Sequence, residues 1–149
     1  MNIATSIEQY NDNYLYFCEP IKNNIMNYGN FIRILYTEHK FTLTGIYILF
    51  TLHDITCEHF YNKYKCFCNI TLNQKLIKQI QAIEKNILNK IEIKNKNPQY
   101  KIYEQLKNGC IQIFQKVITK NASHNFILKI SGIWSNTNSY GLTYKFIVP

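Results

Sequence analysis

One amphipathic helix, set among β-rich segments, is the feature that most constrains how this chain can fold. Apolar residues recur at spacings of three and four, as a helix with one buried face requires. They are Leu72, Leu76, Ile80, Ile83, Ile87 and Ile91. Thr71 and Gln74 have the spacing of a capping box, and the polar stretch that ends at Pro98 stops the pattern. The sequence therefore predicts one long helix over about residues 72–92.

Short segments rich in β-branched and aromatic residues lie on both sides of this helix. A hairpin is predicted from residues 31–36 and 41–52, with Gly45 marking a bend or bulge. Further strands are predicted over residues 61–68, 110–118, 126–134 and 140–148, the last two joined as a hairpin. Residues 1–30 show no sustained period and form a poorly assigned N-terminal extension, with a short strand suggested at residues 14–18 and a loop at residues 23–30. We expect a single domain over residues 1–149, of the α+β class and mostly β.

The order of these elements is that of an OB-like curled antiparallel barrel, whose helix lies between the third and fourth core strands. The strand predicted at residues 110–118 is additional to that order. It belongs either to an elaborated loop or to an added barrel strand. A β-sandwich with one covering helix is the alternative fold.

The charge of the chain favours nucleic acid as a partner, but only in part. Lys and Arg number 17 against 9 Asp and Glu, a formal net charge of +8, and clustered cations release counterions when they bind phosphates. The chain is nevertheless rich in Asn, Ile, Lys and Tyr, with Arg33 as its single arginine, which is how an AT-rich genome encodes any protein. Nucleic-acid binding therefore depends on whether lysines and aromatic residues share an exposed face.

Two groups of residues are candidates for such a face. Strand alternation places Tyr61, Lys63, Lys65 and Phe67 together on the more cationic side of the strand at residues 61–68. The final hairpin adds Lys129 and Lys145, with Trp134 and Tyr140 beside its loop. Alternation puts Tyr140 and Lys145 on opposite faces, so these residues do not all line one groove. Core packing is the competing interpretation, above all for Tyr144 and Phe146, and Trp134 is equally suited to close a barrel mouth.

The cysteines suggest neither a disulfide framework nor a metal site. Their number is five, which is odd and fits reduced thiols, so we expect no structural disulfide. Zinc-ligand residue types occur at Cys57, His59, Cys66 and Cys68, but the spacing differs from that of common zinc knuckles, and buried cysteines are the favoured interpretation. We expect no metal and no cofactor.

Enzymatic function finds no support in the motifs. No glycine-rich phosphate loop, nucleophile elbow or paired-carboxylate pattern occurs, and nothing favours a nucleophile pair of Cys110 with His124. No apolar run is long enough for a membrane helix, and the N-terminus does not resemble a secretory signal. The expected location is intracellular, not secreted, with no membrane as a partner.

Residues 106–109 (LKNG), 128–134 (LKISGIW) and 140–147 (YGLTYKFI) resemble the closing hairpin of OB-fold single-stranded DNA-binding proteins of large DNA viruses. The resemblance covers about the last third of the chain. It implies a viral replication or recombination accessory that coats exposed strands in the host nucleus or cytoplasm. We therefore expect a non-enzymatic protein that binds single-stranded DNA or RNA with low sequence specificity. The alternative is a protein-interaction module whose aromatic strands meet a partner or, in a homo-oligomer, a second copy of the chain.

Overall fold

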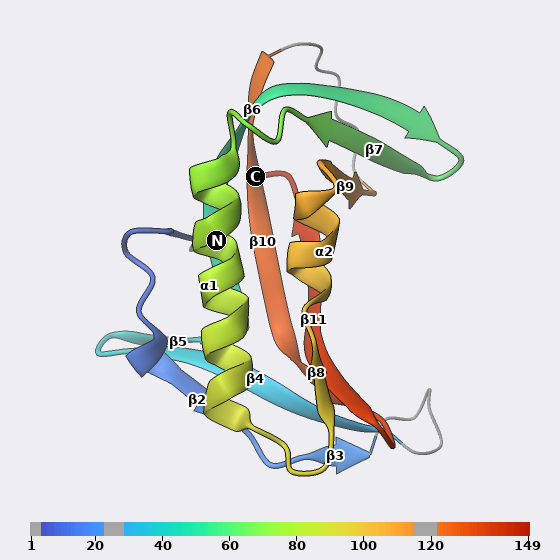
Figure 1. The fold of residues 1–149 in the computed structure, drawn as a ribbon. Coiled ribbons are helices and arrows are strands. Elements are labelled where there is room, and N and C mark those ends of the chain that lie inside the picture. The colour runs from blue at the N-terminus through green and yellow to red at the C-terminus, as the bar shows by residue number, and fades with distance from the viewer. Residues whose placement is uncertain (1–3, 23–28, 115–121) are drawn as a thin grey trace.

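The computed structural model describes residues 4–22, 29–114 and 122–149 as a large, bent sheet with two α-helices on one of its faces (Figure 1). The elements are β1 (Thr5–Ser6), a 3₁₀ turn η1 (Asp12–Tyr14), β2 (Leu15–Phe17), β3 (Ile21–Lys22), β4 (Asn30–Glu38), β5 (Phe41–Thr44), β6 (Ile46–Phe60), β7 (Lys63–Cys68), α1 (Gln74–Ile91), β8 (Asn97–Gln99), α2 (Lys101–Lys107), β9 (Cys110–Ile113), β10 (Ala122–Ser135) and β11 (Ser139–Ile147). The prediction of a mostly β chain with a long helix is confirmed.

Strand β10 organises the sheet because it has partners along both edges. One edge pairs first with β6 and then with β4, while the other pairs with β11. Beyond Ile55, β6 leaves β10, arches away and pairs with β7, which in turn pairs with β9 (Figure 1). Asp54, with a φ of 53°, lies at this change of partner, where the β6–β10 register also shifts. The arch carries the β6–β7 hairpin away from the centre of the sheet.

The core lies between α1, α2 and one face of this sheet, which we call the inner face. The predicted apolar stripe is found from Leu76 to Ile91, with Ile80 and Ile87 completely buried, but Leu72 precedes the helix and is 61% exposed. Ile80 and Ile87 pack with alternate residues of the strands, such as Ile48, Leu128 and Phe146. The opposite face of the sheet, which we call the outer face, is turned away from both helices (Figure 1).

The start of α1 differs from the predicted capping box. The helix begins at Gln74, and its N-cap residue is Asn73, whose side chain makes no capping bond. Instead the Asn73 amide ties the helix to β6: its Oδ1 accepts from His53 N at 2.8 Å and its Nδ2 donates to His53 O at 2.9 Å. The predicted Thr71–Gln74 capping box is therefore wrong. The side chain at the N-cap position bonds to the backbone of β6 and not to the first turn of α1.

The short helix α2 was not predicted, and a buried carboxylate holds it in place. Glu84 of α1 is 1% exposed, and its two oxygens accept from the backbone N–H groups of Ile102 and Tyr103, each at 3.0 Å. These are donors of the first turn of α2, which have no partner within the helix. Burial raises the pKa of Glu84, and the two backbone bonds partly oppose that shift.

The predicted strands are found, but the one at residues 41–52 is divided at Gly45, and its second part, β6, extends to Phe60 and pairs with β10. β4 and β5 form the expected antiparallel hairpin, and Gly45, with a φ of 108°, separates β5 from β6. Tyr61 lies in the turn before β7 rather than in the strand. β10 and β11 form the expected final hairpin. Of the strand predicted at residues 110–118, residues 115–118 lie outside the described part of the chain.

The sheet is open where a barrel would close. Its curvature brings Cα atoms of β9 and β11 within 8 Å of each other, yet no backbone ladder joins the two strands in the described residues. Paired strands lie about 4.8 Å apart. The helix follows β7 and is succeeded by β8, α2 and β9. Neither α-helix in the described ranges is long and apolar enough to cross a membrane.

Candidate nucleic-acid interface

A row of basic and aromatic side chains crosses the outer face of the sheet. Tyr47 of β6 lies opposite Lys129 of β10, which lies opposite Lys145 of β11. The Lys129 ammonium is 5.6 Å from the centre of the Tyr47 ring, a cation–π distance. Lys145 is exposed. Two of the predicted lysines therefore lie side by side on an open face.

Two further rows extend this face toward the end of the β10–β11 hairpin. Arg33, Gly132 and Thr143 form the next row. The last is formed by Phe31, Trp134 and Gly141. The Arg33 guanidinium lies 5.9 Å from the Phe31 ring centre. We call these three rows the sheet face; none of their members is acidic, so no carboxylate within them opposes an approaching phosphate.

Glycines let the two large rings lie against the sheet. A Cβ on Gly141 would be 2.9 Å from Trp134 Cζ2, and one on Gly132 would overlap the Phe31 ring. Each ring therefore occupies space above a backbone that has no side chain. Trp134 is half-buried in this position. A partly exposed indole beside cations is a suitable surface for a nucleobase.

The second predicted group lies at the tip of the β6–β7 hairpin. We call Phe60, Tyr61, Lys63, Lys65 and Phe67 the hairpin patch. Tyr61 is 83% exposed and Phe67 42% exposed, whereas Cys66 is 1% exposed. The predicted faces are thus found for Cys66 and Phe67, but Tyr61 lies in the turn, and Lys63, Tyr64 and Lys65 are all half-buried. The Lys65 ammonium lies 4.4 Å from the Phe60 ring centre. The patch joins exposed aromatic rings with cations, although Glu58 lies opposite Lys65.

A hollow between β9 and β11 connects the two groups. Its volume is about 270 Å³, and it is lined by Gln105, Gln112, Phe114, Tyr144, Lys145 and Phe146. Lys63 of the hairpin patch donates to Gln112 Oε1 at 3.4 Å, and Lys145 belongs to the sheet face. Phe114 at its margin is 65% exposed. Lys145 of the sheet face thus lines the hollow, Lys63 of the hairpin patch contacts its lining residue Gln112, and the lining contains no carboxylate.

Tyr144 forms part of this hollow as a neutral hydrogen-bond donor. Its hydroxyl donates to Gln105 Oε1 at 2.8 Å, which links β11 to α2. Burial, together with the carboxylates of Glu84 and Glu104, raises the pKa of Tyr144 to about 12. Its predicted packing against the core is found, as is that of Phe146, which is 2% exposed.

Tyr140 is the predicted binding residue that the structure separates from the others. It is 4% exposed and faces the helices, because strand alternation places it on the inner face, opposite Ser135. Phe31, Arg33, Tyr47, Phe60 and Phe114 were not predicted. Pairing between segments distant in sequence brings Phe31, Arg33 and Tyr47 to the sheet face, which no local pattern reveals, whereas Phe60 lies in the local β6–β7 hairpin.

The expectation that all five cysteines are reduced is wrong. Cys57 and Cys66, directly opposite each other on β6 and β7, form a disulfide, while Cys18, Cys68 and Cys110 are free. An odd total does not exclude one bonded pair. With their sulfurs joined, Cys57 and Cys66 are not zinc ligands, and His59 stacks on Tyr64 at 4.7 Å between ring centres. The described part of the chain holds no group of three metal-ligating side chains.

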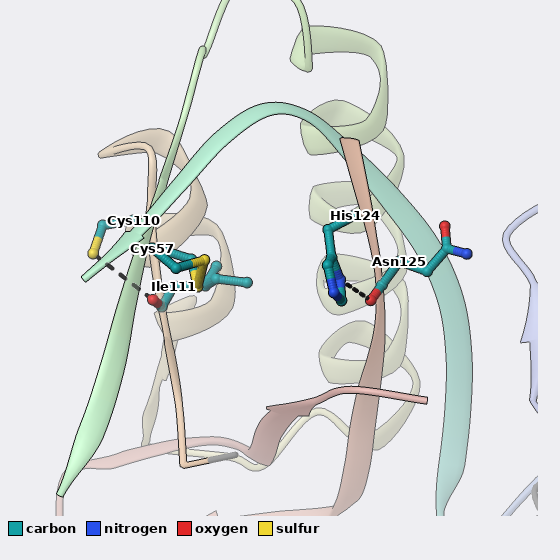
Figure 2. Close-up of a disulfide and its surroundings, with 6 residues drawn as sticks. Cys57, Cys110, Ile111, His124 and Asn125 are labelled. Atoms are coloured by element: carbon teal, nitrogen blue, oxygen red, sulfur yellow. Dashed lines mark hydrogen bonds between the residues drawn. A yellow bond between two sulfur atoms is a disulfide. The ribbon is translucent and has the colours of Figure 1, made fainter. Parts of the chain in front are cut away.

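Cys110 and His124 do not form a nucleophile pair either. Cys110 Sγ donates to the Ile111 carbonyl at 3.9 Å, and His124 Nδ1 donates to the Asn125 carbonyl at 2.7 Å (Figure 2). Burial raises the pKa of the Cys110 thiol and so disfavours the thiolate. The Cys110 thiol is thus neither paired with a base nor activated.

The candidate interface therefore consists of the sheet face, the hairpin patch and the hollow between them. It offers aromatic rings and cations, the groups that bind bases and phosphates respectively. Comparison of the chain with protein-family models, with curated proteins and with solved structures finds no match.

Proposed function

We propose that this protein binds single-stranded nucleic acid, DNA rather than RNA, with little sequence preference and without catalysing a reaction. The observation that carries the proposal is the acid-free sheet face, on which Lys129 and Lys145 lie side by side within two rows of Trp134. Stacking contributes about 1–3 kcal/mol per base whatever its sequence, and a line of cations follows the phosphates. The hairpin patch extends this surface through the hollow.

Two further features support the proposal. The approach of β9 to β11 within 8 Å, with α1 following the β6–β7 hairpin, is the arrangement expected of an incompletely closed OB-like barrel. The resemblance of residues 128–134 and 140–147 to single-stranded DNA-binding proteins of large DNA viruses falls on the hairpin that carries Lys129, Trp134 and Lys145. A role in viral replication or recombination follows from that resemblance.

Intrinsic fluorescence offers a direct test, because Trp134 is the only tryptophan in the chain. Titration with a thymidine oligonucleotide should quench or shift its emission as a base stacks on the indole. Trp134→Ala and Tyr61→Ala should each weaken binding about tenfold, measured by anisotropy of a labelled oligonucleotide, since each removes one stacking ring. Both variants should keep the circular dichroism spectrum of the parent protein.

A charge-matched pair separates local contacts from net charge. Lys145→Gln and Lys85→Gln remove the same charge, but Lys85 is exposed on α1, on the other side of the sheet. Only Lys145→Gln should weaken binding appreciably. Equal effects of the two substitutions would show attraction to the whole basic protein and would contradict a specific interface.

The second candidate function is protein binding, and the exposed rings of the hairpin patch favour it. Phe60, Tyr61 and Phe67, together with Phe114 of the hollow, are 42–83% exposed, and clustered apolar surface commonly marks a protein interface. This function predicts no response to oligonucleotides. Self-association, seen as concentration-dependent mass in sedimentation and abolished by Phe67→Ser, would identify a second copy as the partner.

A further inference from the structure

The disulfide lies within the hairpin that carries the hairpin patch. Between the Cys57–Cys66 bond and the turn lie three cross-strand pairs: Glu58 with Lys65, His59 with Tyr64, and Phe60 with Lys63. The bond lies under the arch of β6, and Cys110 points to the other side of the sheet from it (Figure 2). The bond thus cross-links the two strands that carry the patch without occupying the binding surface.

Few other contacts of the backbone hold this part of the hairpin. β10 pairs with β6 only as far as Ile55, and β9 pairs with β7 only between Tyr64 and Phe67. Residues 57–60 of β6 therefore pair with β7 alone, as far as the described residues show. The Lys65–Phe60 contact at 4.4 Å crosses between the two strands and needs them in register. The order of residues 57–60 therefore depends on β7, to which the disulfide fixes them.

We propose that the Cys57–Cys66 disulfide is a reducible modification site, and that its reduction by a dithiol weakens single-strand binding by loosening the hairpin patch. This inference rests on the proposed function. A reductant thiolate attacks Cys57 Sγ, forms a mixed disulfide and expels the Cys66 thiolate. The second reductant thiol then displaces Cys57. Two electrons and two protons pass to the protein, leaving two cysteine thiols and a cyclic reductant disulfide.

The surroundings of the bond favour this course. Cys57 is half-buried whereas Cys66 is 1% exposed, so Cys57 is the more accessible of the two partners. Two free cysteines, Cys68 and Cys110, lie on the neighbouring strand positions, and burial raises the pKa of both thiols. The raised pKa disfavours the thiolate form of both cysteines, and with it their attack on the disulfide. The Cys57–Cys66 pair therefore alternates between a disulfide and two thiols.

The test compares oxidised and dithiothreitol-reduced protein by oligonucleotide anisotropy and by hydrogen exchange of residues 57–65. Titration of the denatured, unreduced protein should find three free thiols, since two of the five cysteines are bonded. Reduction should weaken binding about fivefold to tenfold, as expected when the ordered hairpin becomes a minor population. It should also speed exchange in residues 57–65. The double variant Cys57→Ser/Cys66→Ser should behave like the reduced protein with or without reductant, and Cys18→Ser like the parent.

Three results would overturn the inference. They are five reactive thiols in unreduced protein, hydrogen exchange that reduction leaves unchanged, or a loss of affinity on reduction that is as large in the double variant as in the parent protein. Failure of the proposed function looks different. In that case the oxidised protein binds no oligonucleotide, while the exchange measurement still decides whether the bond controls the hairpin.

Discussion

Glu84→Ala should lower the free energy of unfolding by about 3 kcal/mol. The substitution leaves the N–H groups of Ile102 and Tyr103 without their acceptors. Ile102 is completely buried, and an unsatisfied buried donor costs about 1–3 kcal/mol. Relief from burying a carboxylate offsets part of that loss. We also expect α2 to detach from α1, because Glu84 is the side chain that joins them through these bonds.

Glu104→Ala is the matched control. Glu104 makes an ion pair with Lys101 at 3.9 Å, but both side chains are about half exposed, at 53% and 52%. Exposed pairs contribute about 0–1 kcal/mol, so this variant should unfold in urea almost as the parent does. Similar losses for the two glutamates would contradict the assigned role of Glu84.

The raised pKa of Glu84 also predicts how stability depends on pH. The folded protein binds this proton more tightly than the unfolded chain, whose carboxyl titrates near 4.5. The Glu84 contribution to the free energy of unfolding should therefore fall as pH rises from 4.5 through the raised pKa, and stay constant above it. Subtracting the urea titrations of Glu84→Gln from those of the parent isolates this slope. A difference that rises with pH would contradict the burial of the carboxyl.

Gly132→Ala should destabilise the fold by about 3 kcal/mol and lower the melting temperature by about 10 °C. β10 lies between β4 and β11 at this residue, and a Cβ would overlap the Ile32 carbonyl oxygen as well as the Phe31 ring. A ring can turn away, but the backbone oxygen belongs to the sheet and yields only if β4 shifts.

Ser131→Ala, at the preceding position, is the control for Gly132→Ala. Ser131 already carries a Cβ, so its loss of a hydroxyl should change the melting temperature little. Calorimetry of both variants provides the measurement. A Gly132→Ala protein as stable as the parent would mean that β4 and β10 do not pack as closely as described.

Local patterns in the sequence predicted the parts of this molecule that depend on neighbouring residues. Periodicity identified α1, and alternation assigned the faces of Cys66 and Phe67 correctly. The β10–β11 hairpin was likewise predictable because its strands are adjacent in the chain. The same reasoning placed Tyr140 and Lys145 on opposite faces of β11, as found.

Long-range contacts account for what the sequence did not reveal. Tyr47 joins Lys129 only because β6 pairs with β10, some 80 residues away, and Arg33 arrives by β4 pairing with the same strand. Glu84 interrupts an apolar stripe as any polar residue could; its role depends on α2 packing beside it. The disulfide depends on register within the β6–β7 hairpin, which counting cysteines cannot supply.

The most direct test of the central claim is the salt dependence of binding to a single-stranded thymidine oligonucleotide. Contacts from Lys63, Lys65, Lys129 and Lys145 predict a slope of about −3 in a log–log plot of affinity against salt, since each single-strand phosphate contributes about −0.7. The double variant Lys129→Gln/Lys145→Gln should reduce the slope by about 1.4, and duplex DNA should bind more weakly. Absence of binding at low salt, or a slope that this variant leaves unchanged, would contradict the proposed interface.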